Sequence, residues 1–577
     1  MVRIHRNFLD PDTPVSCIGS GELGGKAQGL AFIREALRSG LDRSKFAEIS
    51  IDIPPLSVIR SDVFDLFMRH NHLYEVVNSD PPDNRIAYEF QKADLPFEVL
   101  GDLRAIVDQV HTPLAIRSSS LLEDAMREPF AGVYATKMIP NNRYDADIRF
   151  RQLTEAIKFV YASTFSRNAR SYRQAIGHSD MDEKMAVIIQ EVAGKRYHNR
   201  FYPELSGVAR SYNYYPMKPA RPQDGIVHLA LGLGKIIVDG GVSWIYSPAY
   251  PKVEPPFGSV NSMIKETQNE FWVVNMGALV DYDPIRETEY LSLENIYTAE
   301  KDDALRYLAS TYNPQSGRLS IGTGFKGPRV LTFAPLLVLE QLPVNELICS
   351  LLTICDGALN APVEIEFAMT FNPHRFSFLQ VRTMVVPVDV TEVSEEELSS
   401  ADALLSSATV LGNGCLDHIR DIVYVKSETF GLEHTRKIVP ELAEINQKML
   451  DSNSPYVLIV LGRLGTADPW LGIPINWGHV SGAKVIVEAT QKNARIELSQ
   501  GSHYFHNIIN LGIKYFSLPF SEQPRIDWDW LKSQPVVEDL KFIRHIRLPD
   551  PLHIKVDGMH GRGVIYKSVG LEHGQPR

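Results

Sequence analysis

The sequence predicts an α/β protein with a large first domain and a smaller second domain. In residues 1–386, apolar runs that alternate like strands are interspersed with helical segments. Residues 387–406 are acidic, polar and poor in bulky apolar side chains, which is typical of a linker leading into a short helix. Beyond them, residues 407–577 carry short β-branched runs bounded by Gly and Pro, as expected of buried strands in a separate α/β domain.

The clearest strand predictions in the second domain are residues 421–426, 456–461 and 484–488. In the first domain, residues 252–330 are rich in Pro, Asp, Glu and Gly and break up the strand pattern, so we interpret them as an elaborated insertion. The chain has 577 residues, of which 44% are hydrophobic, and is therefore long enough to bury more than one core.

Composition and charge argue against two classes of partner. The net charge is −11 and the basic residues are scattered, so we expect no nucleic-acid partner. No run approaches about 18 consecutive apolar residues and the N-terminus lacks the apolar core of a signal peptide, so we expect a cytoplasmic protein without a membrane partner. The four cysteines form no CxxC pair and are expected to be reduced. The oligomeric state is left open, a homo-oligomer included.

A glycine-rich turn over residues 19–25 precedes Lys26 and an amphipathic segment. Glycines let backbone amides approach a phosphate, and a lysine supplies a point charge. The spacing is not that of a Walker A loop, and Ala27 stands where that motif needs Ser or Thr. Taken alone, an ordinary glycine-rich turn with a solvated Lys26 is the simpler interpretation.

A second phosphate-compatible turn follows an apolar strand that ends at Arg117 and continues into Ser118–Ser120. Arginine offers a planar fork of donors suited to phosphate oxygens, and Gly132 would let the following loop close over them. The alternative is an ion pair of Arg117 with Glu123 or Asp124. Two such turns in succession favour the phosphate interpretation.

Another apolar run is predicted to be a buried strand that ends in polar residues at Gln190. A strand of this kind can form a hinge, whose backbone and side-chain amide could bind an adenine edge. On its own it is merely a strand. The sharpest pattern comes later, where alternation places Glu364 and Glu366 on one face of a strand, and Gln380 and Arg382 on one face of the next.

A hairpin would bring these four polar side chains together. Carboxylate and amide oxygens are hard ligands suited to Mg²⁺, which bridges nucleotide phosphates, and an arginine would neutralise developing charge. We expect Glu366 and Gln380 to lie in a surface cleft. An exposed polar hairpin face is the alternative.

The order of these segments is recognisable. GGK, IRSSS with EDA, PFAG, IIQEV, SGVA, GLG, EIEF and LQVR, in that order, resemble the ATP-binding domain of pyruvate phosphate dikinases and phosphoenolpyruvate synthases over most of residues 15–384. The resemblance implies a two-lobed, ATP-grasp-like domain that binds Mg-ATP.

The resemblance also implies a role at the Mg-ATP site for eight residues. These are Lys26 and Arg117 at the phosphates, Gly132 and Thr136 in the loop over them, Gln190 at the adenine hinge, Glu366 and Gln380 as magnesium ligands, and Arg382 at the transferring phosphoryl group. The chain departs from the family at Lys235, where an acid is common, and at Val133 and Tyr134, which replace polar residues.

The family normally continues with a mobile, swivelling-type domain that bears a phosphorylated histidine in a GGxTSHAA-like loop, and then with a barrel that handles pyruvate. Fewer than 200 residues follow the linker and a barrel needs at least ~200, so we expect no barrel here. Residues 407–577 would be a diverged phosphohistidine-like domain.

The best match to the phosphohistidine is His503, which follows a Gly-Ser turn and precedes an LGI triplet at 511–513. Tyr504 and Phe505 are bulky where the family has alanines, so a structural histidine at the N-terminus of an aromatic helix is an equal alternative. His479 and His506 are competing acceptors in poorer contexts.

The resemblance therefore implies an ATP-dependent phosphotransferase that passes a phosphoryl group, through His503, to an unknown small-molecule or protein acceptor and releases AMP. Two alternatives stay open. One is a regulatory protein that binds ATP as a sensor, and the other is an ATP-grasp ligase that activates a carboxylate and releases ADP.

Overall fold

The computed structural model describes residues 15–79, 81–121, 132–175, 183–214, 216, 219–255, 259–278, 281–384, 386, 391–465, 472–475, 477–490, 513–519, 526–558 and 560–567. The chain divides into two compact units. The first comprises Met1–Arg173, His178–Val238 and Val242–Met384, and the second comprises Gln174–Gly177, Asp239–Gly241 and Val385–Arg577. Both units contain helices and several sheets, so the predicted mixed α/β class is confirmed.

The first unit begins with a five-stranded sheet. In spatial order its strands are β1 (Val15–Ile18), β3 (Leu56–Ile59), β6 (Met185–Glu191), β4 (Leu114–Ser120) and β5 (Thr136–Ile139). The inner strands β4 and β6 are almost wholly buried runs of apolar and small residues, as the sequence pattern predicts. Because β6 lies between β3 and β4, Gln190 is paired with Leu56 on one side and with Ala115 on the other.

Helices α1 (Gly25–Gly40), α2 (Ser61–His70) and α6 (Ala146–Ser163) pack on this sheet. The other helices of this part of the chain are α3 (Leu73–Asn78), α4 (Asp83–Lys92), α5 (Phe97–Gln109), α7 (Arg167–Ala175) and the short 3₁₀ helix η1 (Arg43–Phe46). Helix α1 buries Ala27, Leu30, Ile33 and Leu37, which recur at helical spacing and form one apolar face.

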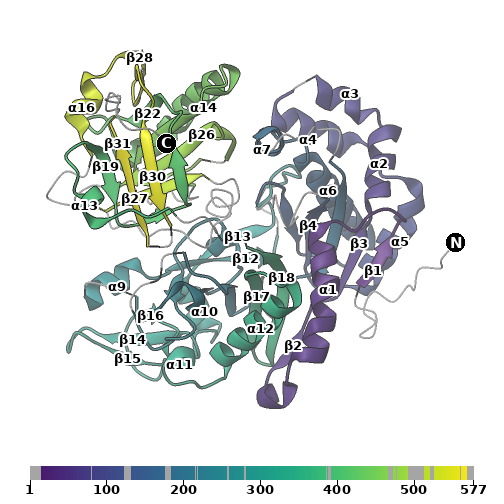
Figure 1. Ribbon diagram of the computed structural model, residues 1–577. Helices are drawn as coiled ribbons and strands as arrows, with labels where there is room; N and C mark the ends of the chain where they lie inside the picture. Colours follow the sequence, from purple (N-terminus) through teal and green to yellow (C-terminus); the bar gives the residue numbers. More distant parts are fainter. Residues whose placement is uncertain are drawn as a thin grey trace. The chain divides into compact units, whose positions relative to one another are not determined.

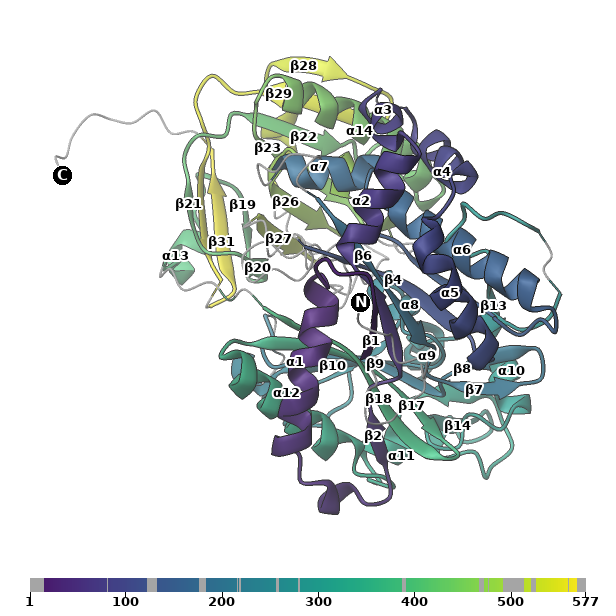
Figure 2. The same cartoon turned by 90° about the vertical axis from the view of Figure 1, so that its right-hand side faces the viewer.

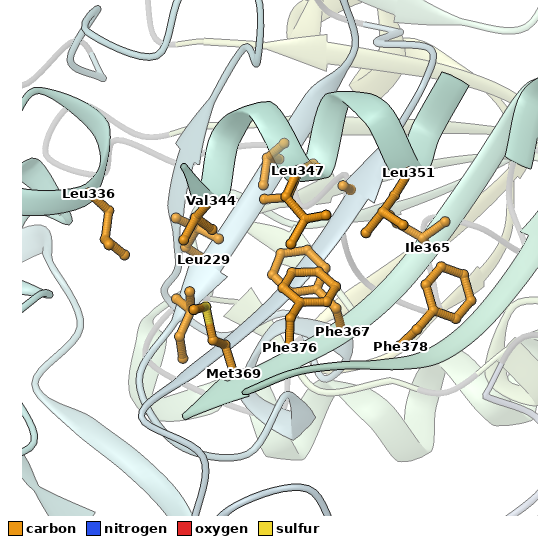
Figure 3. Close-up of a cluster of buried hydrophobic side chains, with 14 of the residues drawn as sticks. Leu229, Leu336, Val344, Leu347, Leu351, Ile365, Phe367, Met369, Phe376 and Phe378 are labelled. Atoms are coloured by element: carbon orange, nitrogen blue, oxygen red, sulfur yellow. The ribbon is translucent and has the colours of Figure 1, made fainter. Parts of the chain in front are cut away.

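The larger sheet of the first unit has six strands. In spatial order they are β11 (Trp244–Tyr246), β10 (Ile226–Ala230), β9 (Leu205–Arg210), β17 (Val363–Phe371), β18 (His374–Thr383) and β2 (Ser50–Asp52). Helix α12 (Val344–Leu359) covers the β17–β18 hairpin. Figure 3 shows Leu347 and Leu351 of this helix facing Phe367, Phe376 and Ile365 of the strands, all within one buried cluster.

Burial of such side chains is worth roughly 1.5–3 kcal/mol each, so the apolar face of the hairpin is fixed firmly. On β17 the polar residues alternate with these apolar ones and therefore lie on the opposite face. On β18 a bulge between Phe378 and Gln380 puts Gln380 and Arg382 on that same polar face. Helix α1 packs beside α12 and against β18 (Figure 2), which brings the N-terminal segment to the same sheet.

Two smaller sheets complete the first unit. Their strands, in spatial order, are β13 (Leu291–Asn295), β12 (Glu270–Asn275), β8 (Arg200–Tyr202) and β7 (Lys195–Tyr197), and β15 (Arg318–Ile321), β14 (Ala309–Asn313) and β16 (Arg329–Leu331). Short helices accompany them: η2 (Pro222–Asp224), α8 (Lys235–Val238), α9 (Val260–Glu266), α10 (Ile296–Lys301) and α11 (Ala334–Leu337). In the part of residues 252–331 that the structure describes, the sequence analysis missed five strands, because Pro and Gly residues concentrate in the turns and obscure short buried runs such as Phe271–Val274.

The second unit centres on a seven-stranded sheet. Its strands, in spatial order, are β20 (Val410–Leu411), β27 (Lys514–Leu518), β26 (Ala483–Ala489), β23 (Tyr456–Leu461), β22 (Asp421–Val425), β29 (Ile543–Arg547) and β28 (Val536–Asp539). The three strands predicted from sequence are confirmed as β22, β23 and β26, and they pair in parallel with one another and with β27. Their near-continuous apolar runs are typical of parallel strands covered on both faces.

A four-stranded sheet and a two-stranded one accompany it. They consist of β19 (Ala403–Ser407), β31 (Arg562–Tyr566), β30 (His553–Asp557) and β21 (Gly414–Leu416), and of β24 (Arg463–Leu464) with β25 (Gly472–Ile473). Strands β30 and β31 run side by side (Figure 1). The helices are α13 (Glu395–Leu398), η3 (Leu432–His434), α14 (Thr435–Asp451), η4 (Trp477–His479) and α16 (Trp528–Ser533). Among the described residues no helix is both long and apolar enough to cross a membrane.

Candidate nucleotide-binding site

The glycine-rich turn before α1 is held by the start of α2. The Asp62 carboxylate accepts hydrogen bonds from the backbone amides of Ser20 (2.9 Å) and Gly21 (2.8 Å) and from the Ser20 hydroxyl. Next to it, the Ser61 hydroxyl accepts from the amide of Glu22 at 2.9 Å. Burial alone would raise the pKa of Asp62, but the bonds from Ser20 and Gly21 outweigh it and lower that pKa.

The amides of Ser20 and Gly21 thus already donate to an internal carboxylate. A phosphate-binding role of the glycine-rich turn stays a prediction. At Gly24, glycine is required because two backbone segments approach each other closely. Gly24 has a φ of 75°, and a Cβ there would lie 1.7 Å from the carbonyl oxygen of Ser119, so no other residue fits.

Lys26 lies in the first turn of α1, where a cation would otherwise be unfavourable because the helix dipole is positive. Its ammonium donates to the Ser118 hydroxyl of β4 at 3.2 Å. The neighbouring Ser119 hydroxyl accepts from the amide of Ala27 (3.1 Å) and donates to the carbonyl of Leu23 (2.9 Å). The helix start is therefore docked on the strand that carries Arg117.

Arg117 joins the two large sheets of the first unit. Its Nη1 donates to Gln190 Oε1 at 3.2 Å and to the carbonyl oxygen of Leu379 at 3.0 Å. Its Nη2 donates to Gln380 Oε1 at 2.6 Å and lies 3.6 Å from Glu366 Oε2. The residues named from sequence thus converge on one guanidinium, although Glu123 and Asp124, the alternative partners, lie outside the described residues.

The predicted hairpin is confirmed. Glu366 pairs directly with Gln380 across β17 and β18, and Glu364 pairs with Arg382. Gln380 is 3% exposed and Glu366 is half-buried, so the expectation of an open surface cleft is wrong for Gln380. The covering groups come from β4 and β6, which sequence reading could not place over the hairpin.

A buried row of charges runs across three neighbouring strands. Arg210 of β9 and Arg382 of β18 both lie opposite Glu364 of β17. Glu364 Oε1 accepts from Arg382 Nε at 2.6 Å and also from its Nη2, while Glu364 Oε2 accepts from Arg210 Nε. Sequence reading missed Arg210, although its place at the end of an apolar strand marked it as a buried cation in need of a partner.

Arg382 also approaches the hairpin's other carboxylate, since its Nη2 lies 3.9 Å from Glu366 Oε1. Glu366 therefore lies between Arg382 and Arg117. We call the sequence Arg210, Glu364, Arg382, Glu366 and Arg117 the charge ladder, because cations and anions alternate along it. Three guanidinium groups against two carboxylates give the charge ladder a net charge of +1.

The other predicted residues lie on the same strands. Thr136 of β5 pairs directly with Arg117 of β4. Gly132 is exposed and precedes β5. Its φ of 61° is a left-handed backbone conformation, which favours glycine at this position. Between them the Tyr134 hydroxyl contacts Glu183 and accepts from Arg173 at 3.2 Å, which fixes the base of the loop in the core.

Gln190 has a different environment from an open hinge. Its side chain is 2% exposed, accepts from Arg117 and donates to the carbonyl of Pro54 at 3.4 Å. The amides that follow it, of Glu191 and Val192, donate to carbonyl oxygens of Pro55 and Pro113. The adenine-hinge role of Gln190 stays a prediction. In the structure its side-chain oxygen accepts a hydrogen bond from Arg117.

The donor set fits a magnesium ion. Among the described residues no group of three or more His, Cys, Asp and Glu side chains is placed to hold a metal. Mg²⁺, however, commonly takes one or two protein oxygens and completes its shell with nucleotide phosphates and water. The carboxylate of Glu366 and the amide oxygen of Gln380, directly opposite each other, are such a pair.

In the second unit, His479 lies half-buried in η4, just before β26. The buried Asn446 fixes this turn, since its amide donates to the carbonyl of Gly478 (3.1 Å) and its oxygen accepts from the amide of Gly482 (2.9 Å). His503 and His506 lie outside the described residues.

Comparison with known proteins identifies the first unit. The family model described as "Pyruvate phosphate dikinase, AMP/ATP-binding domain" matches residues 20–401. An uncharacterized phosphotransferase, YvkC, of Bacillus subtilis (strain 168) is 24% identical over 206 residues, which are 35% of this chain and 22% of that protein. A phosphoenolpyruvate synthase of Aeropyrum pernix is 27% identical over 243 residues, which are 38% of this chain and 26% of that protein. The matches span about a quarter of the length of these curated relatives.

Proposed function

This chain belongs to the family of pyruvate phosphate dikinase AMP/ATP-binding domains, and from that membership we propose that it is a phosphotransferase that uses Mg-ATP at the charge ladder. The observation that carries the proposal is the convergence of Glu366, Gln380 and Arg117 from two different sheets. One carboxylate, one amide oxygen and a forked cation are the groups that a metal-bound polyphosphate requires.

The proposal assigns each group a task. Glu366 and Gln380 would hold Mg²⁺, which neutralises and orients the phosphates when bound. Arg117 and Lys26 would bind phosphate oxygens from the side of β4 and α1, and Arg382 would stabilise charge on the phosphoryl group in transfer. Phosphoryl transfer asks a protein mainly for positioning and electrostatics, which a rigid ladder of paired charges supplies.

We propose His503 of the second unit as the first acceptor. Its imidazole nitrogen would form a bond to the β-phosphorus of ATP, the bond from that phosphorus to the AMP oxygen would break, and AMP would leave. The γ-phosphate would pass to a second acceptor, and the phosphohistidine to a small molecule or protein whose identity is open. In the phosphohistidine loop of the family that the sequence resembles, the histidine opens a helix, whose N-terminus would favour the negative product.

Product analysis tests the proposal. After incubation with Mg-ATP, AMP is the expected nucleotide product, ADP would instead indicate ligase chemistry, and unchanged ATP that is nevertheless bound would indicate a sensor. ATP labelled at the β-phosphate should leave acid-labile, alkali-stable label on the protein. That label should be lost in His503→Ala and kept in His479→Ala, and label that persists in His503→Ala excludes this acceptor.

A further inference from the structure

A polar pocket of about 400 Å³ lies in the first unit, next to the small sheet of β14, β15 and β16. It is lined by Arg306 and Tyr307, which precede β14, by Gly322 and Thr323, which follow β15, and by Gln341, which follows α11. Its volume is within the range of about 300–1,000 Å³ that small-molecule sites occupy. The charge ladder contributes no lining residue, so the pocket is a separate feature of this unit.

The loop that supplies one wall of the pocket is held in place on both sides of Thr323. Before it, the hydroxyl of Thr311 donates to the carbonyl oxygen of Gly322 at 2.7 Å. After it, Nη1 of Arg329 donates to the carbonyl oxygen of Phe325 at 2.8 Å. The Thr323 hydroxyl is therefore positioned by the protein itself, and a ligand would not have to order this loop.

Aromatic packing fixes a second wall. The ring of Tyr307 has its centroid 4.7 Å from that of Phe371 and 5.9 Å from that of His374. The guanidinium of Arg306, which is exposed, lies 5.4 Å from the centre of the same tyrosine ring. Tyr307 thus holds Arg306 by a cation–π contact and presents its own hydroxyl from a rigid ring.

The pocket is distant from the proposed magnesium ligands. Phe371 and His374 flank the turn of the β17–β18 hairpin, whereas Glu366 and Gln380 pair further along the same strands. A strand rises about 3.3 Å per residue, which places the pair roughly 15–20 Å from the turn. A molecule in the pocket would therefore occupy a site of its own.

The lining side chains are rich in hydrogen-bond donors. The guanidinium of Arg306 only donates, the amide of Gln341 carries two donor hydrogens, and the hydroxyls of Tyr307 and Thr323 can each donate one. Within the described part of the chain, none of these four side chains forms a hydrogen bond or an ion pair. Such a set of donors around one cation suits the oxygens of a carboxylate or a phosphate.

The acidic residues nearest in sequence are not partners of Arg306. Glu340 is paired with Lys252 at 2.9 Å, and Asp303 forms no ion pair with Arg306. Lys326, in the loop that follows β15, adds a second exposed cation near the pocket in sequence. The charges therefore favour an anion over a cation or a neutral ligand.

We propose that this pocket binds a small organic oxyanion, that is, a metabolite with a phosphate or a carboxylate group. Arg306 would bind the anionic group with its planar fork of donors, and Thr323, Tyr307 and Gln341 would donate to the remaining oxygens. A pocket of this volume has room for an organic body besides the anionic group. This inference goes beyond the proposed function and does not depend on it.

Calorimetry with three probes tests the proposal. Glycerol phosphate carries a phosphate group, succinate carries carboxylates, and phosphoglycolate carries both. Binding of any probe supports the inference if Arg306→Gln weakens it by about tenfold or more, because a charge-assisted pair of hydrogen bonds is lost. Thr323→Val keeps the shape, removes one hydroxyl and should weaken the same probe by a smaller factor. Binding of glycerol phosphate but not succinate identifies a phosphate ligand, and the reverse identifies a carboxylate.

Two control variants separate this pocket from other sites. Arg318→Gln removes an exposed arginine of β15 that does not line the pocket, and Arg117→Ala alters the proposed ATP site. Both should bind the probe as the wild type does. In the wild type, the bound probe should also slow the modification of Arg306 by phenylglyoxal, located by mass spectrometry, and leave that of Arg318 unchanged.

Three results would overturn the inference. They are a wild type that binds none of the probes, an Arg306→Gln variant that is folded by thermal unfolding and binds as tightly as the wild type, and binding that is lost in Arg117→Ala but kept in Arg306→Gln. None of these results bears on the proposed function, which is tested by its nucleotide products.

Discussion

The guanidinium of Arg117 donates a hydrogen bond of 2.6 Å to the side-chain oxygen of Gln380, although 263 residues separate them in the chain. The bond joins β4 of one sheet to β18 of another, and Glu366 and Gln190 meet the same guanidinium. A substitution at any of these positions should therefore affect the positions of the other three side chains.

Removal of a magnesium ligand should stop turnover. Glu366→Gln deletes the carboxylate proposed to bind Mg²⁺ but keeps the volume, so nucleotide consumption at saturating magnesium should fall to the background. Glu300→Gln, which deletes a carboxylate paired with Arg329 at the surface, is the control and should stay active. Equal turnover in both variants would refute the metal assignment.

Loss of the forked donor should weaken nucleotide binding. Arg117→Ala removes contacts to two sheets and to the phosphates, so the affinity for ATP should fall by about tenfold or more. Arg117→Lys should recover only part of it, because a lysine cannot donate to Gln190 and Gln380 with one planar group. Calorimetry with ATP measures both, and unchanged affinity in Arg117→Ala would make the residue structural.

The hydrogen bonds from Ser20 and Gly21 to the Asp62 carboxylate should make the stability of the glycine-rich turn depend on pH. Since the folded-state pKa of Asp62 lies below its ordinary value, its contribution to stability is present above about pH 4 and is lost as the pH falls through the folded-state pKa. Asp62→Ala should therefore unfold at a lower temperature than the wild type at pH 7, and the difference should shrink as the pH falls below about 4. A gap that is constant with pH would show that the charge is immaterial.

Glu488 should have the opposite dependence on pH. It is buried in β26, where it accepts from the amide of Leu464 (2.9 Å) and contacts the hydroxyl of Tyr515. Burial raises its pKa from 4.5 to about 7 in spite of these bonds. Its contribution to stability is therefore full below pH 4.5 and is lost as the pH rises to about 7.

The variant Glu488→Gln mimics the protonated acid at every pH. Relative to the wild type it should gain roughly 1–3 kcal/mol of unfolding free energy at pH 8, and this gain should shrink toward pH 5. The exposed Glu444→Gln on α14 is the control. Thermal unfolding across this pH range measures the effect, and parallel curves for the wild type and Glu488→Gln would contradict it.

The sequence by itself determined which polar residues share a face within each strand of the hairpin. Alternation alone placed Glu364 and Glu366 on one face, and Gln380 and Arg382 on one face of the next strand, because side chains of a strand alternate with a period of two. The same logic located β22, β23 and β26, and the order of short motifs pointed to the family that the comparison then identified.

Only the tertiary structure decided which distant groups meet. Nothing in the local pattern indicates that Asp62 occupies the amides of the glycine-rich turn, or that Arg210 divides the oxygens of Glu364 with Arg382. Such contacts join segments that are far apart in the sequence. The periodicity of a strand predicts the face on which a side chain lies, but it does not predict which residue of another strand that side chain will contact. That partner is fixed when the sheets pack, since a buried charge must find its counterion in whichever strand the fold brings beside it.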